Sequence, residues 1–428
     1  MYLFYFLFFY FALTVFYLFS LSVAGRLFAR RLRRLTPAPG SVSGSGSVSS
    51  SVSGSVSGSG SAPGSGSGTA SATQRIAILV PAYKEDGIIV STARSHLGLD
   101  YPKDMYDIYI LADSFQEGTL QQLSELPVEV LVMQFEKSTK IKSLNSALGR
   151  IQKEYDIVVI SDADNVLARD FLTKVAASFV AGERVVQGRR VAKNMDTSYA
   201  LLDACSEAIN NHIFRKGPNG LGLSAPLIGS GMAFDARMIR ELLAGIDSVV
   251  EDKVLQLRIV RRGLFIRYRE DALVFDEKVD SSHGLKQQRK RWISGQFVNL
   301  RESFFPAFGQ LFRGNISYFN FGVMNNLVLP RAFLFVLLPA LVVAGWFVSP
   351  GWGIASTVLL AAYLFSLMIA IPRVLVNRDL LTALMKLPKA IFVMAGALLQ
   401  MKKSHKAFIH TVHTKTEISN SLFNENGK

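Results

Sequence analysis

The feature that most constrains the fold is an apolar run that ends in two carboxylates. Val158, Val159 and Ile160 are β-branched, which predicts a buried strand, and Asp162 and Asp164 follow it closely. In open α/β sheets, ligands bind beyond the carboxyl ends of the strands. Mg²⁺ or Mn²⁺ suits such a pair of carboxylates if a turn begins between them, because these ions prefer oxygen ligands. A solvated turn after a strand is the alternative.

Residues 74–304 surround this run with alternating strand and helix signals. Further strands are expected at 76–80, 106–111 and 128–133. This alternation is typical of a doubly wound α/β domain. Polar residues follow several of these strands, so we expect them to lie along one edge of the sheet.

Residues 1–25 predict a transmembrane helix, because they are almost wholly apolar and long enough to cross a bilayer. Arginines follow this helix, so the positive-inside rule places the N-terminus outside and the central domain in the cytoplasm. A cleaved signal peptide is the alternative, although such peptides carry their charge before the apolar region. Residues 26–73 predict a basic juxtamembrane segment and a disordered linker rich in Ser, Gly and Val.

The C-terminal part predicts further membrane contacts. Residues 305–326 mix aromatic and polar residues, which is typical of an interfacial segment. Residues 327–371 hold two apolar spans around a tight turn, which predicts a transmembrane hairpin. In residues 372–428, the apolar run at 384–400 is too short to span a bilayer. We expect an interfacial helix there, followed by a basic cytoplasmic tail.

The net charge of +14 raises the question of an anionic partner. Many positive residues flank the apolar spans, and no nucleic-acid-binding module is recognisable. We therefore attribute the charge to the lipid bilayer and expect no nucleic-acid partner. Cys205 is the single cysteine, which excludes a disulfide within the chain and fits a reducing compartment. An integral protein of the inner or plasma membrane is expected.

Four polar residues near the predicted strand ends are candidates for binding a nucleotide. Asp113 can accept the ring N–H of a uracil, Tyr83 offers an aromatic face, and Glu85 offers an acceptor. Lys140 opens a predicted helix and can reach a phosphate. Each residue alone is as well explained by packing, a surface position or helix capping.

Two later segments offer groups for chemistry on a sugar. Gly229 and Ser230 lie in a turn of small residues, where the backbone can approach a ring, although a strand bend explains them as well. Glu251 and Asp252 open a predicted helix. A carboxylate there is either a cap or a general base that takes a proton from an attacking hydroxyl.

Gln288, Arg291 and Trp292 share one face of a helix that precedes the C-terminal apolar spans. An arginine can bind two oxygens of a leaving diphosphate, and a tryptophan ring can stack on a sugar. A basic helix that touches anionic lipid is the alternative.

These motifs, in this order, resemble those of the membrane-integrated family 2 glycosyltransferases, which include cellulose, chitin and hyaluronan synthases. The resemblance covers about residues 74–300 and rests on Pro81 to Glu85, Asp113, Lys140 to Asn145, Asp162 to Asp164, Glu251-Asp252 and Gln288 to Trp292. It implies a GT-A fold and an inverting, metal-dependent transfer of a sugar from a nucleotide sugar, with a UDP-sugar as the expected donor.

The resemblance also implies a role for each residue. Nucleotide-sugar binding falls to Tyr83, Glu85, Asp113, Lys140, Asp162, Gln288 and Arg291; metal binding to Asp162 and Asp164; base catalysis to Asp252; and acceptor binding to Trp292, Gly229, Ser230 and Glu251.

Two positions depart from the family's pattern. Ala112 precedes Asp113 where many members have two aspartates, and Val250 stands where many have threonine. The expected product is a β-linked polysaccharide or oligosaccharide. Addition of one sugar to a membrane lipid and a catalytically inactive synthase partner are the alternatives, and a homo-oligomer or partner subunit stays open.

Overall fold

The computed structural model describes residues 1–27, 73–136, 138–246, 251–278 and 282–385, together with residues 418 and 420. Of residues 282–291 it describes the backbone alone. The expected linker at 26–73 and the expected interfacial run at 384–400 therefore lie almost wholly outside the described residues.

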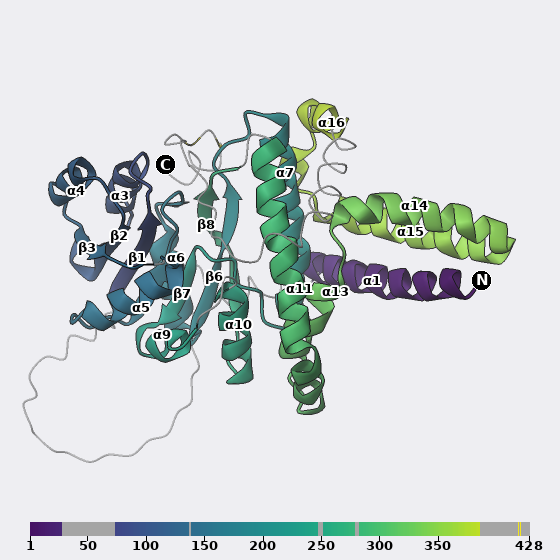
Figure 1. Ribbon diagram of the computed structural model, residues 1–428, viewed down its shortest axis with the longest axis horizontal. Coiled ribbons are helices and arrows are strands. Elements are labelled where there is room, and N and C mark those ends of the chain that lie inside the picture. The colour runs from purple at the N-terminus through teal and green to yellow at the C-terminus, as the bar shows by residue number, and fades with distance from the viewer. Residues whose placement is uncertain are drawn as a thin grey trace, which may run out of the picture.

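A mixed sheet forms the centre of the molecule (Figure 1). Over the described residues it has eight strands in the order β3-β2-β1-β4-β7-β6-β8-β5. The strands are β1 (Ile76–Tyr83), β2 (Tyr106–Asp113), β3 (Glu129–Met133), β4 (Ile157–Ile160), β5 (Val166–Leu167), β6 (Val185–Ala192), β7 (Met232–Asp235) and β8 (Arg267–Asp276). β1 to β4 pair in parallel, as a doubly wound sheet requires. β5 and β7 run antiparallel to their neighbours, so the other half of the sheet is mixed.

Helices cover both faces of the sheet. One face packs against α3 (Ile89–Leu97), α4 (Glu117–Ser124) and α6 (Phe171–Val180), and the other against α5 (Lys140–Arg150), α9 (Ala236–Leu243) and α10 (Glu251–Arg261). Residues 76–80 of β1 are all buried. Because both faces are covered, this strand is a continuous apolar run rather than an alternating one. Each fully buried aliphatic side chain in it contributes about 1.5–3 kcal/mol.

A glycine marks an irregularity between β6 and β8, whose register shifts between Gly188 and Arg189. A Cβ atom at Gly188 would lie 2.8 Å from the Phe171 ring and 2.9 Å from the carbonyl oxygen of Ala272, so a larger residue does not fit. Gly188 pairs with Arg269 and Arg189 with Leu273, so β8 carries three extra residues at this point. An odd number of extra residues changes the face on which the following side chains lie. Beyond the shift, Arg190 contacts helix α7 (Ser198–Asn210).

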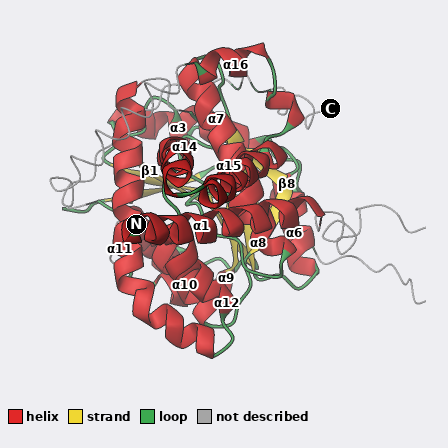
Figure 2. Cartoon of the chain, turned by 90° about the vertical axis from the view of Figure 1, so that its right-hand side faces the viewer, coloured by secondary structure: helices red, strands yellow, loops and turns green. Residues whose placement is uncertain are grey.

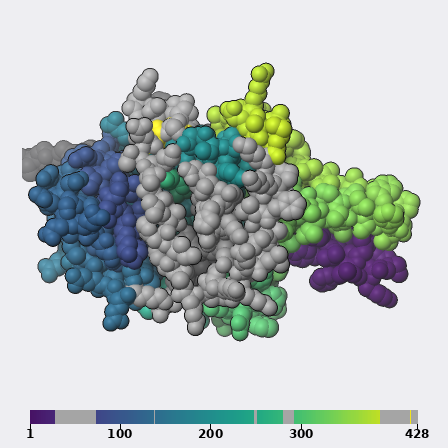
Figure 3. All heavy atoms as spheres, turned by 45° about the horizontal axis from the view of Figure 1, so that its top comes forward, coloured from purple at the N-terminus to yellow at the C-terminus, as the bar shows by residue number. Residues whose placement is uncertain are grey.

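Three apolar helices form a lobe on one side of the molecule, purple and green in Figure 3. They are α1 (Tyr2–Leu27), α14 (Arg331–Val348) and α15 (Pro350–Ala370), and each is long and apolar enough to cross a membrane. The three helices pack against one another (Figure 2). The ring of Trp352 lies 5.8 Å from that of Phe4 and 4.9 Å from that of Phe8, which joins α15 to α1.

Helix α1 also packs against the α/β domain that contains the sheet. It contacts the π-helical turn η2 (Asn211–Lys216) and the short helix α8 (Gly217–Gly220). The Nε2 atom of His212 lies 2.9 Å from the carbonyl oxygen of Ser22. The hydroxyl of Tyr17 donates to the side-chain oxygen of Asn320 over 2.6 Å. Helix α1 is therefore a packed part of the structure.

One helix, α11 (Ser282–Phe312), spans the expected boundary at residue 304 and contains Pro306. The chain then folds back along it. The remaining short elements are η1 (Lys103–Met105), α12 (Ile316–Phe319), η3 (Asn320–Met324), α13 (Asn325–Leu327), η4 (Arg373–Leu375) and α16 (Arg378–Leu384).

Gly217 offers a test of the contact between α1 and α8. A Cβ atom there would lie 2.5 Å from the carbonyl oxygen of Leu21, which is backbone and moves only with its helix. We expect Gly217→Ala to destabilise the protein by about 1–3 kcal/mol, measured by thermal unfolding in detergent. Gly149→Ala is the control, because nothing lies within 4 Å of its added Cβ atom and alanine favours a helix. A Gly217→Ala variant as stable as the control would contradict this packing.

Candidate active site

The parallel strands β1, β2 and β4 end at one edge of the sheet, and two residues there adopt an unusual backbone. Tyr83 and Asp113 are paired at the last positions of β1 and β2, and the amide of Lys84 donates to the carbonyl oxygen of Asp113 over 3.1 Å. Lys84 and Ser114, the next residues, have φ angles of +55° and +60°. Such strained conformations in residues other than glycine cluster at functional sites.

The carboxylate of Asp113 is buried at this edge and held by two hydroxyl groups. Ser138 donates to one oxygen, and Ser114 donates to the other over 3.0 Å. Glu85 is also buried, whereas Tyr83 is half-buried. The structure thus gathers Tyr83, Glu85 and Asp113 at two adjacent strand ends, as the sequence predicts.

Lys140 joins the ends of two other segments. Its ammonium forms an ion pair with Asp162 and donates to the carbonyl oxygen of Gly229 over 2.7 Å. The amide of Asp162 donates to the hydroxyl of Ser230 over 3.0 Å. Gly229 has a φ angle of +88°, and a Cβ atom there would approach both Lys140 and Asp162. Lys140 therefore pairs with a carboxylate in this structure, where the sequence suggested a phosphate.

A turn does begin between the two aspartates. The amide of Asn165 donates to the carbonyl oxygen of Asp162 over 3.1 Å. The hydroxyl of Thr92, on α3, donates to the carbonyl oxygen of Ala163 over 2.7 Å. Asp164 is 9% exposed. The turn is thus held from within and from α3.

The start of α10 adds two carboxylates to this charge cluster. Burial, together with the charge of Asp252, raises the pKa of Glu251 to about 7, and Lys140 opposes this rise. Burial also acts against the charge of Lys140. The attraction of Asp162, Glu251 and Asp252 outweighs it, so the pKa of Lys140 is raised. A group of charges that shift one another in this way is a candidate functional site.

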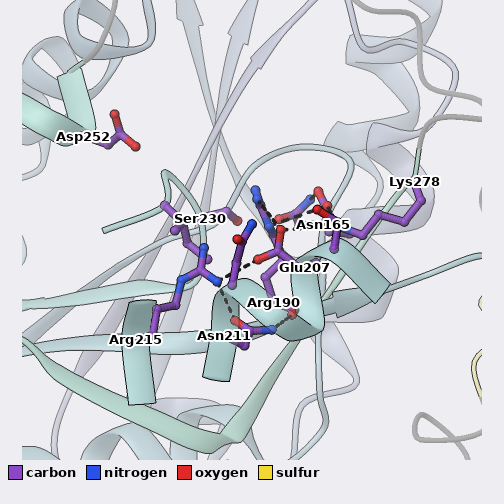
Figure 4. A network of polar contacts seen from close by, with 12 residues as sticks. Asn165, Arg190, Glu207, Asn211, Arg215, Ser230, Asp252 and Lys278 are labelled. Atoms are coloured by element: carbon purple, nitrogen blue, oxygen red, sulfur yellow. Dashed lines mark hydrogen bonds and ion pairs between the residues drawn. The ribbon is translucent and has the colours of Figure 1, made fainter. Parts of the chain in front are cut away.

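Asp252 itself is anchored by the helix end. One of its oxygens accepts from the amide of Lys253 over 2.8 Å, and its side chain is partly exposed. Figure 4 shows its carboxylate at a distance from the buried network around Glu207. Trp292 lies half-buried on α11, whereas the side chains of Gln288 and Arg291 are outside the described residues.

Sequence reasoning missed several residues that hold the site. Ser138 contacts Asp113, and Thr92 contacts Ala163 between the two aspartates, but both are ordinary small polar residues in the sequence. Lys193 is 1% exposed and its ammonium lies 3.4 Å from the carbonyl oxygen of Asp164. The sequence does mark the place of Ser138. Thr139, the next residue, caps α5 by accepting from the amide of Lys142, so Ser138 directly precedes the start of that helix.

Comparison with known proteins extends this description. Residues 73–295 match the family model described as glycosyltransferase like family 2. The β-monoglucosyldiacylglycerol synthase of Trichormus variabilis is 28% identical over 232 residues, which are 52% of this chain and 49% of the relative. A putative cellulose synthase 2 of Komagataeibacter xylinus is 26% identical over 61% of this chain and 18% of its own length. The chain therefore spans about half or less of these two relatives.

Among solved structures, a mannosyltransferase from Pyrobaculum calidifontis in complex with GDP-mannose and Mn²⁺ aligns with a TM-score of 0.49 and 18% identity. The alignment covers 92% of this chain and 100% of the mannosyltransferase. The family match extends over half of the chain and contains the candidate site residues on the sheet edge and on α10. The mixed sheet with helices on both faces agrees with the expected α/β fold, and the chain belongs to the family 2 glycosyltransferases.

Proposed function

We propose that this chain is an inverting, metal-dependent membrane glycosyltransferase. It moves a sugar from a nucleotide sugar, expected to be a UDP-sugar, to a growing polysaccharide or oligosaccharide and forms a β-linkage. The observation that carries the proposal is the meeting of Lys140, Asp162 and the start of α10, three segments that lie far apart in the sequence. Their charges influence one another, as the groups of a single catalytic site do.

The nucleoside is assigned to the ends of β1 and β2. The buried carboxylate of Asp113 faces two hydroxyl donors and is suited to a directed hydrogen bond from a base. Tyr83 supplies an aromatic face and Glu85 a further acceptor. The diphosphate is assigned to Lys140, Gln288 and Arg291.

Asp162 and Asp164 fit a divalent cation, because both provide hard oxygen ligands on one turn. Among the described residues no group of three or more His, Cys, Asp or Glu side chains comes together to hold a metal ion. Two carboxylates would leave positions on the ion for diphosphate oxygens, which Mg²⁺ commonly binds together with one or two carboxylates. When bound, Mg²⁺ or Mn²⁺ would supply positive charge that stabilises the departing nucleoside diphosphate.

Asp252 is assigned as the general base. Its carboxylate takes the proton from an acceptor hydroxyl, and the hydroxyl oxygen then attacks the anomeric carbon from the face opposite the diphosphate. The C–O bond to the diphosphate breaks as the new glycosidic bond forms, so the configuration inverts. Gly229, Ser230, Glu251 and Trp292 are assigned to the acceptor.

The three apolar helices support a site at a bilayer. The arginines that follow α1 favour an N-terminus outside and a catalytic domain in the cytoplasm. An acceptor attached to a lipid is a second candidate, because the relative that is 28% identical is named as a synthase of a glucosylated diacylglycerol.

Sizing of the product separates these two acceptors. Purified full-length protein in lipid vesicles is incubated with labelled UDP-sugars, and the products are resolved by size. We expect a ladder or a long chain for the glycan acceptor. A single labelled lipid that does not grow with time would establish the second candidate and contradict polymerisation.

Asp252→Asn tests the base. We expect a loss of transfer of about 10²–10⁴-fold with donor binding nearly unchanged, because the amide cannot accept the proton. Glu251→Gln is the matched control: a pKa of about 7 leaves Glu251 largely protonated below pH 7, where glutamine resembles it. This variant should therefore retain most of its turnover at pH 6 with saturating acceptor. If Glu251→Gln lost transfer and Asp252→Asn kept it, Glu251 would be the base instead.

Removal of divalent ions tests the metal. We expect a chelator to abolish transfer and added Mn²⁺ or Mg²⁺ to restore it. Asp164→Asn should raise the Mn²⁺ concentration needed for half-maximal activity, because an amide oxygen carries no charge. Full activity of the wild-type protein in excess chelator would contradict a metal-dependent reaction.

A further inference from the structure

A chain of buried polar contacts begins at the aspartate turn. Asn165, next to Asp164, donates from its side-chain amide to a carboxylate oxygen of Asp276 over 3.2 Å. The other oxygen of Asp276 accepts from the Lys278 ammonium over 2.6 Å, and it lies 3.6 Å from the Nε atom of Arg190. The turn is therefore attached to a buried pair of cations on β6 and just beyond β8.

Glu207 on α7 is the centre of this network (Figure 4). One of its oxygens accepts from Arg190 over 3.0 Å and the other from Arg215 over 2.9 Å, while Lys278 lies 3.9 Å away. Arg215 also donates to the side-chain oxygen of Asn211 over 2.7 Å. The side chain of Glu207 is 5% exposed. Although burial opposes its charge, the surrounding cations hold the pKa of Glu207 far below its usual value.

The same helix connects this network to the membrane lobe. Arg331, the first residue of α14, donates to the side-chain oxygen of Asn210 at the end of α7 over 2.9 Å. His212, in the next turn, contacts Ser22 of α1. The hydroxyl of Ser22 in turn donates to the carbonyl oxygen of Ser366 on α15 over 2.7 Å.

We propose that Glu207 is a positioning residue for the metal-binding turn, which it holds through Arg190, Asp276 and Asn165. This inference rests on the proposed metal role of Asp162 and Asp164. Glu207 holds the guanidinium of Arg190 beside Asp276, which keeps the acceptor of Asn165 in place.

Loss of the Glu207 charge has two consequences at the turn. Arg190 loses its acceptor at one end and is free to rotate away from Asp276. In addition, Arg190, Arg215 and Lys278 are left with too little negative charge nearby, and the surplus positive charge repels a divalent cation. Both effects weaken metal binding, and neither removes a group that contacts the sugar.

The test measures Mn²⁺ binding directly. Full-length protein in detergent with UDP is titrated with Mn²⁺, and the free ion is followed by electron paramagnetic resonance. We expect Glu207→Gln to raise the dissociation constant for Mn²⁺ about tenfold, which is in the usual range for a residue that supports metal ligands. At saturating Mn²⁺, kcat should stay within about twofold of wild type. A misfolded protein would instead lose kcat as well as Mn²⁺ binding. Glu241→Gln is the control, because Glu241 pairs with Arg262 at the surface and is 71% exposed at its side chain.

Asn165→Leu is a second variant for the case in which Glu207→Gln does not fold. It removes the bond to Asp276 with a side chain of the same branching and number of heavy atoms, and it leaves the ion pairs of Glu207 intact. It should therefore also weaken Mn²⁺ binding. The positioning role is overturned if wild-type protein binds Mn²⁺ in the presence of UDP and a folded variant has a Mn²⁺ dissociation constant within twofold of the wild-type value. If wild-type protein itself binds no Mn²⁺, the proposed metal-dependent function fails first.

Discussion

The ammonium of Lys140 is the central charge of the candidate site, because it pairs with Asp162 and is attracted by Glu251 and Asp252. Two unit charges about 4 Å apart interact by about 4 kcal/mol at an effective dielectric constant of 20. Three carboxylates that are partly removed from water therefore repel one another unless a cation lies among them. Burial, with the charge of Asp252 added to it, raises the pKa of Glu251 to about 7, although Lys140 opposes this rise. A divalent cation on Asp162 and Asp164, as proposed above, would add positive charge beside these carboxylates.

The lobe formed by α1, α14 and α15 and the α/β domain are joined by packing as well as by the chain. Helix α1 contacts η2 and α8 closely enough to require glycine at Gly217, and Arg331 of α14 contacts the end of α7. Helix α7 carries Glu207, whose ion pairs extend to the aspartate turn. The spans are therefore placed relative to the sheet edge by direct contacts. This arrangement is what a transferase needs when its acceptor lies at a membrane and its donor is dissolved in water.

Much of the first half of the fold follows from the sequence, because parallel strands covered on both faces appear as continuous apolar runs. The polar residues after β1, β2 and β4 could be placed at one edge for the same reason. The antiparallel strands β5 and β7 could not be predicted, since two- and four-residue strands carry too short a pattern.

The candidate site was predictable where a residue type carries its own chemistry and unpredictable where a residue only supports another. Asp162 and Asp164 were recognised as a carboxylate pair, and a turn between them was required for that reason. The partner of Lys140 was not predictable, because the distance between its helix and Asp162 is set by the packing of α5. Glu207 gave no signal, since a lone glutamate on a helix usually faces water.

A structure of the full-length protein with UDP and Mn²⁺, determined by electron cryomicroscopy in a lipid nanodisc, tests the central claim most directly. The account predicts an ion on the carboxylates of Asp162 and Asp164, the uracil beside Asp113, and the diphosphate within reach of Lys140. Nucleotide density away from this edge of the sheet, or an ion held by other residues, would contradict it.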